Sequence, residues 1–201
     1  MGKLDKLGAV VTGAGEGIGE AIAKEIASNG AKVACIDFNE ESGNSTAKSI
    51  NESGGEAVFI KTDISDPNQV KSMISDSLGF LGSIDILVNN AAKFIFGAVE
   101  DVSQDQWEDI LKVNVIGYST CVKEALPHLK KSGKSAVVNL ASVSSIIAGP
   151  KFVPYNTSKG AVLMLTRSLA VDLAEFGIRV NSIHPGTTKT ELVVKAADTY
   201  Q

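Results

Sequence analysis

Tyr155 and Lys159 stand four positions apart in a stretch of helical period, and their side-chain types are suited to moving a proton. Residues at this spacing project from the same face of a helix. A phenol titrates near 10, but an ammonium at about 4 Å, in an effective dielectric constant of about 20, stabilises a phenolate by up to roughly 4 kcal/mol. Such a phenol could exchange a proton with an alcohol or a ketone. The alternative is a surface tyrosine beside a solvated lysine.

Ser142 follows an apolar run, and its hydroxyl is a candidate hydrogen-bond donor to the oxygen of such a substrate. The alternative is a serine that only caps a turn, because Ser144 and Ser145 stand beside it. His128 and His184 have no partners at metal-ligand spacing, so the sequence predicts no metal site. His184 is interpreted as a packing residue.

A glycine-rich stretch, TGAGEGIG at residues 12–19, follows the first apolar run and opens the first helical pattern. Glycines allow a tight turn and let the backbone approach a pyrophosphate, and the helix N-terminus supplies N–H groups and the positive end of the dipole. Asp37 ends the next apolar run, where an acidic side chain accepts hydrogen bonds from an adenosine ribose and repels a 2′-phosphate. These features predict a site for NAD, with NADP disfavoured. Ordinary turn chemistry is the alternative.

The elements that must position these residues alternate along the chain, which is the pattern of βαβ units around a parallel sheet. The expected strands are 8–12, 32–37, 57–62, 84–89, 135–141 and 179–184, and the expected helices are 17–29, 39–53, 66–81, 103–131 and 152–176. Right-handed crossovers then give a doubly wound α/β fold of three layers, with strand order 3-2-1-4-5-6. Ligands are expected at the carboxyl ends of the strands.

Composition sets the class of protein. The 201 residues are 44 % hydrophobic and 21 % charged, which predicts a single soluble globular domain. A net charge of −4 without a basic excess argues against a nucleic-acid partner, and no apolar run approaches the roughly 18 residues of a membrane span. Cys35 and Cys121 lie in apolar surroundings, as suits reduced thiols in the cytoplasm.

The ordered motifs resemble those of the short-chain dehydrogenase/reductase family over about residues 5–193. The motifs are the glycine-rich stretch 12–19, Asp63-Ile64, Asn89-Asn90-Ala91-Ala92, Asn114, Ser142, Tyr155 with Lys159, and Pro185-Gly186 ahead of Thr190. The resemblance implies an oxidoreductase that transfers a hydride between NAD(H) and a secondary alcohol or ketone, as a homodimer or homotetramer. An NAD(H)-binding sensor without turnover is the alternative.

The resemblance also implies residue roles. Tyr155 matches the general acid/base, Lys159 the residue that lowers its pKa and binds the nicotinamide ribose, and Ser142 the residue that orients the reacting oxygen. Asn114 matches the asparagine that helps to hold a water in the proton relay. The residues expected to bind the cofactor are Gly13, Gly17, Ile18, Gly19, Asp37, Asp63, Ile64, Asn90, Ala91, Tyr155, Lys159, Pro185, Gly186 and Thr190.

Two departures from the family pattern are visible. Ala92 stands where the family most often has glycine, and the chain gives only a short tail after Thr190. Family members usually continue through a substrate-covering helix and a seventh strand, so the sequence is expected to be an incomplete version of a longer protein. The stretch 93–96 either lines a substrate pocket or is a loop with ordinary apolar packing, and Ile146, Ile147 and Phe152 suggest an apolar pocket wall.

Overall fold

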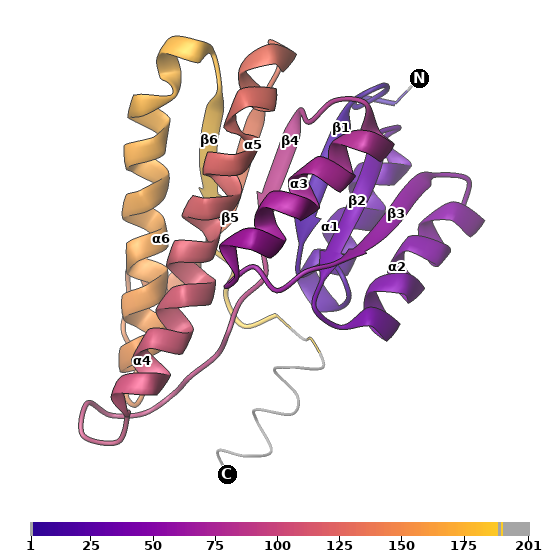
Figure 1. Cartoon of the computed structure of the whole chain (residues 1–201). Coiled ribbons are helices and arrows are strands. Elements are labelled where there is room, and N and C mark those ends of the chain that lie inside the picture. The colour runs from indigo at the N-terminus through magenta and orange to yellow at the C-terminus, as the bar shows by residue number, and fades with distance from the viewer. Residues whose placement is uncertain (1, 189, 191–201) are drawn as a thin grey trace.

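The computed structural model describes residues 2–188 and 190. The strands are β1 (Gly8–Thr12), β2 (Lys32–Asp37), β3 (Glu56–Lys61), β4 (Ile86–Asn89), β5 (Ala136–Leu140) and β6 (Arg179–Ile183). They form one six-stranded sheet in the order β3-β2-β1-β4-β5-β6, with every pairing parallel (Figure 1). The doubly wound order predicted from the sequence is confirmed.

Helices and short helical turns connect these strands. They are α1 (Gly17–Ser28), α2 (Glu40–Glu52), α3 (Pro67–Leu81), α4 (Gln104–Leu111), the π-helix η1 (Lys112–Gly117), α5 (Tyr118–Ser132), the 3-10 helix η2 (Val143–Ser145), α6 (Val153–Asp172) and the 3-10 helix η3 (Ala174–Phe176). Several boundaries have a local chemical cause. The Asp66 side chain accepts hydrogen bonds from the N–H groups of Asn68 and Gln69 and so caps α3. Gly82 ends α3 in the left-handed conformation, with φ of 79°.

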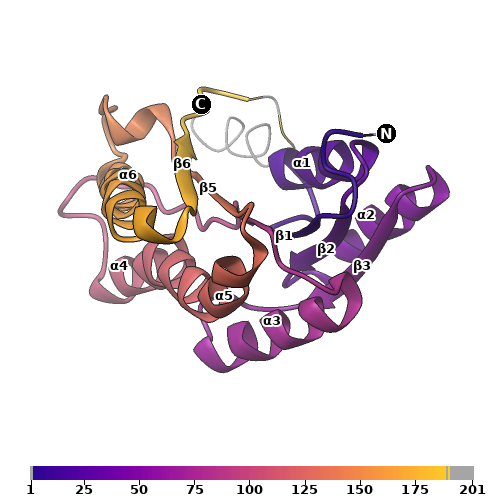
Figure 2. The ribbon, with the colours of Figure 1, turned by 90° about the horizontal axis from the view of Figure 1, so that it is seen from above.

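The sheet lies between two layers of helices, as Figure 2 shows from above. Helices α3, α4, α5 and α6 cover one face, and α1 and α2 cover the other face over β1, β2 and β3. Over β5 and β6 the described residues place no helix on the α1 side, and Ile183 of β6 is 50 % exposed. Among the described residues, no helix is both long and apolar enough to cross a membrane.

Central strand β1 is buried along its whole length because it has a strand on each side and helices on both faces. Its apolar residues alternate between the two cores. Val10 joins the cluster under α3 and α5, and Val11 joins the smaller cluster under α1 and α2. This two-sided burial explains why β1 is a continuous apolar run rather than an alternating one.

One expected helix proved to be more complex than its sequence pattern. The segment 103–131 was expected to be a single helix, but η1 interrupts it between α4 and α5. Asn114 lies inside η1, and its side-chain amide bonds to the backbone of Lys93 instead of facing solvent. A π-helical turn of six residues between two α-helices is too short for apolar periodicity to reveal.

Asp85 ties together the amino ends of three strands. Its Oδ2 accepts hydrogen bonds from the Gly8 N–H at 2.7 Å and from the Ser83 hydroxyl at 2.6 Å, and the Ser132 hydroxyl donates to Oδ1. Its own N–H and C=O bond to β1 and β5. Burial raises the pKa of this carboxyl, but the hydrogen bonds and the charge of Lys134 outweigh burial, so the pKa lies below its ordinary value.

Replacing Asp85 should therefore destabilise the fold. Asp85→Asn, which loses acceptor capacity at a buried site, should lower the free energy of unfolding by about 1–3 kcal/mol at pH 7 in urea titrations. Because the folded pKa is depressed, this stabilisation is present above about pH 4 and is lost as the pH falls through the folded pKa, so the two proteins should converge in acid. Asp76→Asn, at an exposed site on α3, is the control and should change stability by less than about 0.5 kcal/mol. Equal stability of both variants at pH 7 would contradict the assignment.

Candidate active site

The turn between β1 and α1 leaves no room for side chains at two of the expected glycines. Gly13 has a φ of 63°, and a Cβ placed there would lie 2.7 Å from Cα of Ala91. A Cβ on Gly19 would lie 1.9 Å from the carbonyl oxygen of Gly13. The backbone of this loop therefore packs closely against both α1 and the segment after β4, which is the geometry needed for a close approach to a pyrophosphate.

Asn90 fastens this loop to the end of β4. Its Nδ2 donates to the carbonyl oxygens of Thr12 at 3.1 Å and Gly13 at 3.0 Å. In return, the N–H groups of Asn90 and Ala91 donate to Oγ1 of Thr12 at 3.0 and 3.2 Å. Asn90 and Ala91 were expected to contact a cofactor, and the structure shows that they hold the shape of the glycine-rich loop.

The N-terminus of α1 opens directly from this loop. Its N-cap residue, Glu16, makes no side-chain capping hydrogen bond, so the side chain does not occupy the N–H groups of the first turn. These N–H groups belong to the residues that include Gly17, Ile18 and Gly19. Together with the helix dipole they fit an anionic group such as a phosphate.

Asp37 lies beside the loop at the carboxyl end of β2. Its side chain is 7 % exposed, and Oδ2 accepts a hydrogen bond from the Gly15 N–H at 2.8 Å. The Asn39 N–H donates to Oδ1 at 2.9 Å. Both partners are backbone groups, which orient the carboxylate without neutralising its charge. The carboxylate oxygens keep acceptor capacity that suits the two hydroxyls of a ribose.

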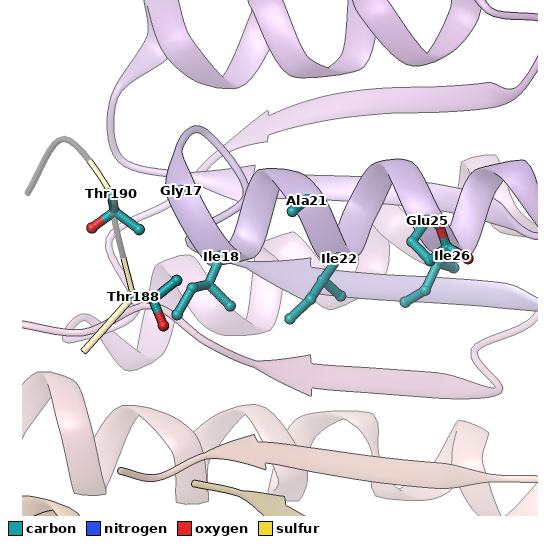
Figure 3. A pocket seen from close by; sticks show the side chains of 8 residues that line it. All are labelled: Gly17, Ile18, Ala21, Ile22, Glu25, Ile26, Thr188 and Thr190. Carbon is teal, nitrogen blue, oxygen red and sulfur yellow. The ribbon is translucent and has the colours of Figure 1, made fainter. Parts of the chain in front are cut away.

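Thr190 lies next to the end of the loop that leads into α1 (Figure 3). A Cβ on Gly17 would lie 3.2 Å from Cγ2 of Thr190, so the two expected cofactor-binding residues are neighbours. Thr188 and Thr190 close the end of a pocket of about 500 Å³ that runs along α1. Its lining residues, drawn in Figure 3, are Gly17, Ile18, Ala21, Ile22, Glu25, Ile26, Thr188 and Thr190. Pro185 joins the same edge of the sheet, where its carbonyl accepts a hydrogen bond from the Val143 N–H, and Gly186 follows it exposed.

Asp63 and Ile64 follow β3 and occupy different environments. Asp63 is exposed, and its carboxylate accepts a hydrogen bond from the Ser65 N–H at 2.9 Å. Ile64 is 5 % exposed and packs so closely on η1 that a Cβ on Gly117 would lie 2.9 Å from the Ile64 carbonyl oxygen. The pair thus joins the carboxyl edge of the sheet to η1, next to the turn that holds Asn114.

Tyr155, Lys159 and Ser142 are brought together at the carboxyl end of β5. Tyr155 and Lys159 project from α6 and are 8 % and 2 % exposed, and Ser142 is 7 % exposed. The Ser142 Oγ accepts a hydrogen bond from the Ser144 N–H at 3.1 Å, so it does cap a turn as well as facing Tyr155. Nζ of Lys159 donates to the carbonyl oxygen of Leu140 at 2.7 Å.

The electrostatics of this group differ from the expectation based on spacing. Burial raises the pKa of Tyr155 above its ordinary value of 10.0, and a hydrogen bond with Ser142 only partly opposes the rise. Burial also lowers the pKa of Lys159 to about 8. Spacing alone does not give the balance between the charge of Lys159, which favours the phenolate, and burial, which favours the neutral phenol, and in this structure burial raises the pKa of Tyr155. Nζ of Lys159 bonds to the Leu140 carbonyl oxygen and lies 6.0 Å from the Tyr155 ring centroid.

Tyr118 is a residue near the site that the sequence reasoning missed. It is fully buried, and its hydroxyl donates to the same Leu140 carbonyl oxygen at 3.4 Å. Its ring centroid lies 5.7 Å from Nζ of Lys159, within the range of a cation–π contact. In the sequence this tyrosine cannot be told from any core aromatic of a helix.

Asn114 connects the segment after β4 to α6. Its Nδ2 donates to the Lys93 carbonyl oxygen and to Oγ of Ser158, both at 3.0 Å, and its Oδ1 accepts from the Lys93 N–H at 2.7 Å. The side chain is fully buried. It therefore holds Lys93 and Ser158 at fixed positions, and its part in a water relay stays a prediction.

His184 follows β6 and is more than a packing residue. Its Nδ1 lies 3.0 Å from the carbonyl oxygen of Ser142, and its Nε2 lies 2.9 Å from Oγ of Ser182. The imidazole thus contacts the backbone of the serine that faces Tyr155. A single histidine without a motif gave no signal for this contact in the sequence.

Known proteins share this arrangement of the chain. The short chain dehydrogenase family matches residues 8–201. Cyclopentanol dehydrogenase of Comamonas sp. is 33 % identical over 201 residues, which cover 100 % of this chain and 80 % of that protein. Meso-2,3-butanediol dehydrogenase of Serratia marcescens is 38 % identical over 190 residues, or 94 % of this chain and 74 % of that protein.

A solved structure agrees with the sequence relatives. A Sinorhizobium meliloti protein assigned as a short-chain alcohol dehydrogenase superposes with a TM-score of 0.90 at 36 % identity. The superposition covers 93 % of this chain and 74 % of that one. The chain therefore belongs to the short-chain dehydrogenase family.

Proposed function

We propose that this protein is an NAD-dependent oxidoreductase that interconverts a secondary alcohol and a ketone. The observation that carries the proposal is the meeting of buried Ser142, Tyr155 and Lys159 at the sheet edge that also bears the glycine-rich loop. Relatives named for the oxidation of cyclopentanol and of a butanediol support a substrate with a CH–OH group.

The described residues fit a nicotinamide dinucleotide. The glycine-rich loop and the N-terminus of α1 suit its pyrophosphate, Asp37 suits the adenosine ribose, and Lys159 is assigned to the nicotinamide ribose. When bound, the nicotinamide dinucleotide would supply the hydride acceptor or donor.

Proton transfer is assigned to Tyr155. Its raised pKa keeps the phenol protonated at neutral pH, ready to donate to the oxygen of a ketone as that oxygen gains negative charge. Ser142 donates a hydrogen bond to the same oxygen and fixes its position. The ammonium of Lys159 offsets the negative charge that the phenol acquires. Alcohol oxidation uses the same groups in reverse.

Assembly into a homodimer or homotetramer stays a prediction. Helix α6 exposes Met164, which is 57 % exposed, and Val171, which is 77 % exposed, and Ile116 of η1 is 55 % exposed. Apolar side chains on neighbouring helices suit the self-complementary interface of a symmetric oligomer.

Removing the phenol hydroxyl should abolish turnover without abolishing binding. Tyr155→Phe should keep NAD affinity within a few-fold and lower kcat by about 10²- to 10⁴-fold, because only general acid/base catalysis is lost. Steady-state rates on a panel of alcohols and ketones, with NAD titrations of both proteins, check this. Near-normal turnover in Tyr155→Phe contradicts the mechanism, and a wild-type protein that binds NAD(H) but turns over nothing in the panel would favour a sensor.

Cofactor choice should depend on Asp37. NAD should bind more tightly than NADP, since a 2′-phosphate would face a carboxylate without a compensating cation. Asp37→Ala should weaken NAD by about tenfold or more and narrow the difference between the two cofactors. Glu40→Ala removes a carboxylate that pairs with Lys61 and is the matched control, with both affinities unchanged. Equal affinity of the wild-type protein for NAD and NADP would refute the assignment.

The rate of ketone reduction should fall as the pH rises through about 8, the pKa to which burial lowers Lys159. Below this pH the ammonium offsets the phenolate charge, and above it the neutral amine does not. A pH profile of kcat/KM checks this, and Lys159→Ala should remove the inflection while lowering the rate. Lys123→Ala, an exposed lysine of α5, should keep the inflection. A wild-type profile that is flat to pH 10 speaks against this role.

A further inference from the structure

Three phenylalanine rings surround the ring of Tyr155. Phe94 stacks on it with a centroid distance of 4.9 Å and an interplanar angle of 18°. The Phe96 and Phe152 centroids lie 5.8 and 6.4 Å from that of Tyr155, and they lie 4.5 Å from each other. We call Phe94, Phe96 and Phe152 the aromatic wall. These distances are those of favourable ring contacts.

The aromatic wall is held in place by backbone hydrogen bonds. Gly97 and Phe152 form a parallel bridge, in which the Gly97 N–H donates to the Lys151 carbonyl at 2.7 Å and the Val153 N–H donates to Gly97 at 3.3 Å. At the other end of the segment, Asn114 bonds to both backbone groups of Lys93. The rings are thus positioned before a ligand arrives, which lowers the entropic cost of binding one.

The wall is apolar and only partly covered. All three phenylalanines are half-buried, so their rings keep accessible surface beside Tyr155. Further exposed apolar side chains follow η2, the 3-10 helix that begins after Ser142: Ile146 is 74 % and Ile147 is 66 % exposed.

The charges near the wall are engaged elsewhere. Nζ of Lys93, the residue before Phe94, lies 2.5 Å from Oδ2 of Asp109, and Nζ of Lys159 is bonded to Leu140. The Lys151 side chain, just before Phe152, is exposed to solvent. The hydroxyls of Tyr155 and Ser142 remain to hold the reacting oxygen, and the rings themselves cannot hydrogen-bond to additional hydroxyls.

We propose that the aromatic wall selects secondary alcohols and ketones whose flank is an apolar ring, aryl or alicyclic, and rejects polyols. The inference rests on the proposed function for the site, since the reacting oxygen must sit at Tyr155 and Ser142. Its flank then lies within reach of the rings that pack on Tyr155. A ring gains stacking and apolar contact there, whereas each hydroxyl left without a partner lowers affinity by about tenfold or more.

The test compares two pairs of alcohols that differ in the flank of the reacting carbon. Cyclohexanol and myo-inositol share a six-membered carbon ring and differ in the number of hydroxyls, and 1-phenylethanol against 2-butanol adds an aryl flank to a short secondary alcohol. We expect kcat/KM for cyclohexanol to exceed that for myo-inositol by at least about 10²-fold, and 1-phenylethanol to exceed 2-butanol. Comparable rates for myo-inositol, with turnover intact, would overturn the inference and leave the proposed function standing.

Ligand binding is measured apart from turnover, so that the selectivity of the aromatic wall and the proposed oxidoreductase function can be contradicted independently. Ligand-observed NMR with the NAD-loaded protein reports on cyclohexanone, acetophenone and inositol whether or not they react. Binding of the two ring ketones without turnover of any alcohol would support the aromatic wall and contradict the proposed function. Tighter binding of inositol than of acetophenone would overturn the aromatic wall.

Variants assign the preference to the rings. Phe94→Leu keeps an apolar side chain but removes the ring, so kcat/KM for 1-phenylethanol should fall about 3- to 10-fold while that for 2-butanol changes less than about twofold. Phe96→Leu should act in the same direction. Phe176→Leu, in η3 at the far end of α6, is the matched control and should change neither rate. An equal loss for both alcohols in Phe94→Leu would mean that the ring only supports the fold, against the proposal.

Discussion

The position of the site depends on the joint between the carboxyl ends of β1 and β4. After β1 the chain continues to a helix on one face of the sheet, and after β4 it continues to a helix on the other face (Figure 2). The Asn90 amide links the two strand ends by donating to the carbonyls of Thr12 and Gly13. Gly19 must lack a side chain because a Cβ there would lie 2.4 Å from Nδ2 of Asn90. The glycines and Asn90 therefore depend on one another. The glycines bring the backbone close, and the amide satisfies the carbonyls that this close approach turns inward.

Hydrogen bonds continue from this joint to the candidate catalytic helix. Three residues after Asn90, both backbone groups of Lys93 bond to Asn114, and the same amide donates to Ser158 on α6. Ser158 directly precedes Lys159. The glycine-rich loop and the Tyr155–Lys159 pair are thus held in one frame, although more than 130 residues of chain separate them. The π-helical turn around Asn114 belongs to this frame, which gives a physical reason for an irregular turn in the middle of a long helical segment.

The sequence was sufficient to predict the structural features that depend on local sequence pattern. Strands β1 and β2 begin and end where the apolar runs predict, and the strand order follows from alternating elements and handed crossovers. Features that depend on contacts between distant segments were not accessible. The bond of Tyr118 to Leu140, the contact of His184 with Ser142 and the interruption at η1 all arise from tertiary packing. The direction of the Tyr155 pKa shift is a further case, because spacing shows that Lys159 is near but not how much water both groups lose.

Burial of Tyr155 links the proposed specificity to the direction in which the phenol transfers its proton. The rings of Phe94, Phe96 and Phe152 exclude water from the phenol, and desolvation is what raises its pKa. In the mechanism proposed above, a protonated phenol is the form that donates to a ketone oxygen. The same rings offer an apolar flank to the substrate. Exchanging them for polar residues to admit a polyol would also rehydrate Tyr155 and lower its pKa, so substrate range and pH dependence cannot be changed independently in this site.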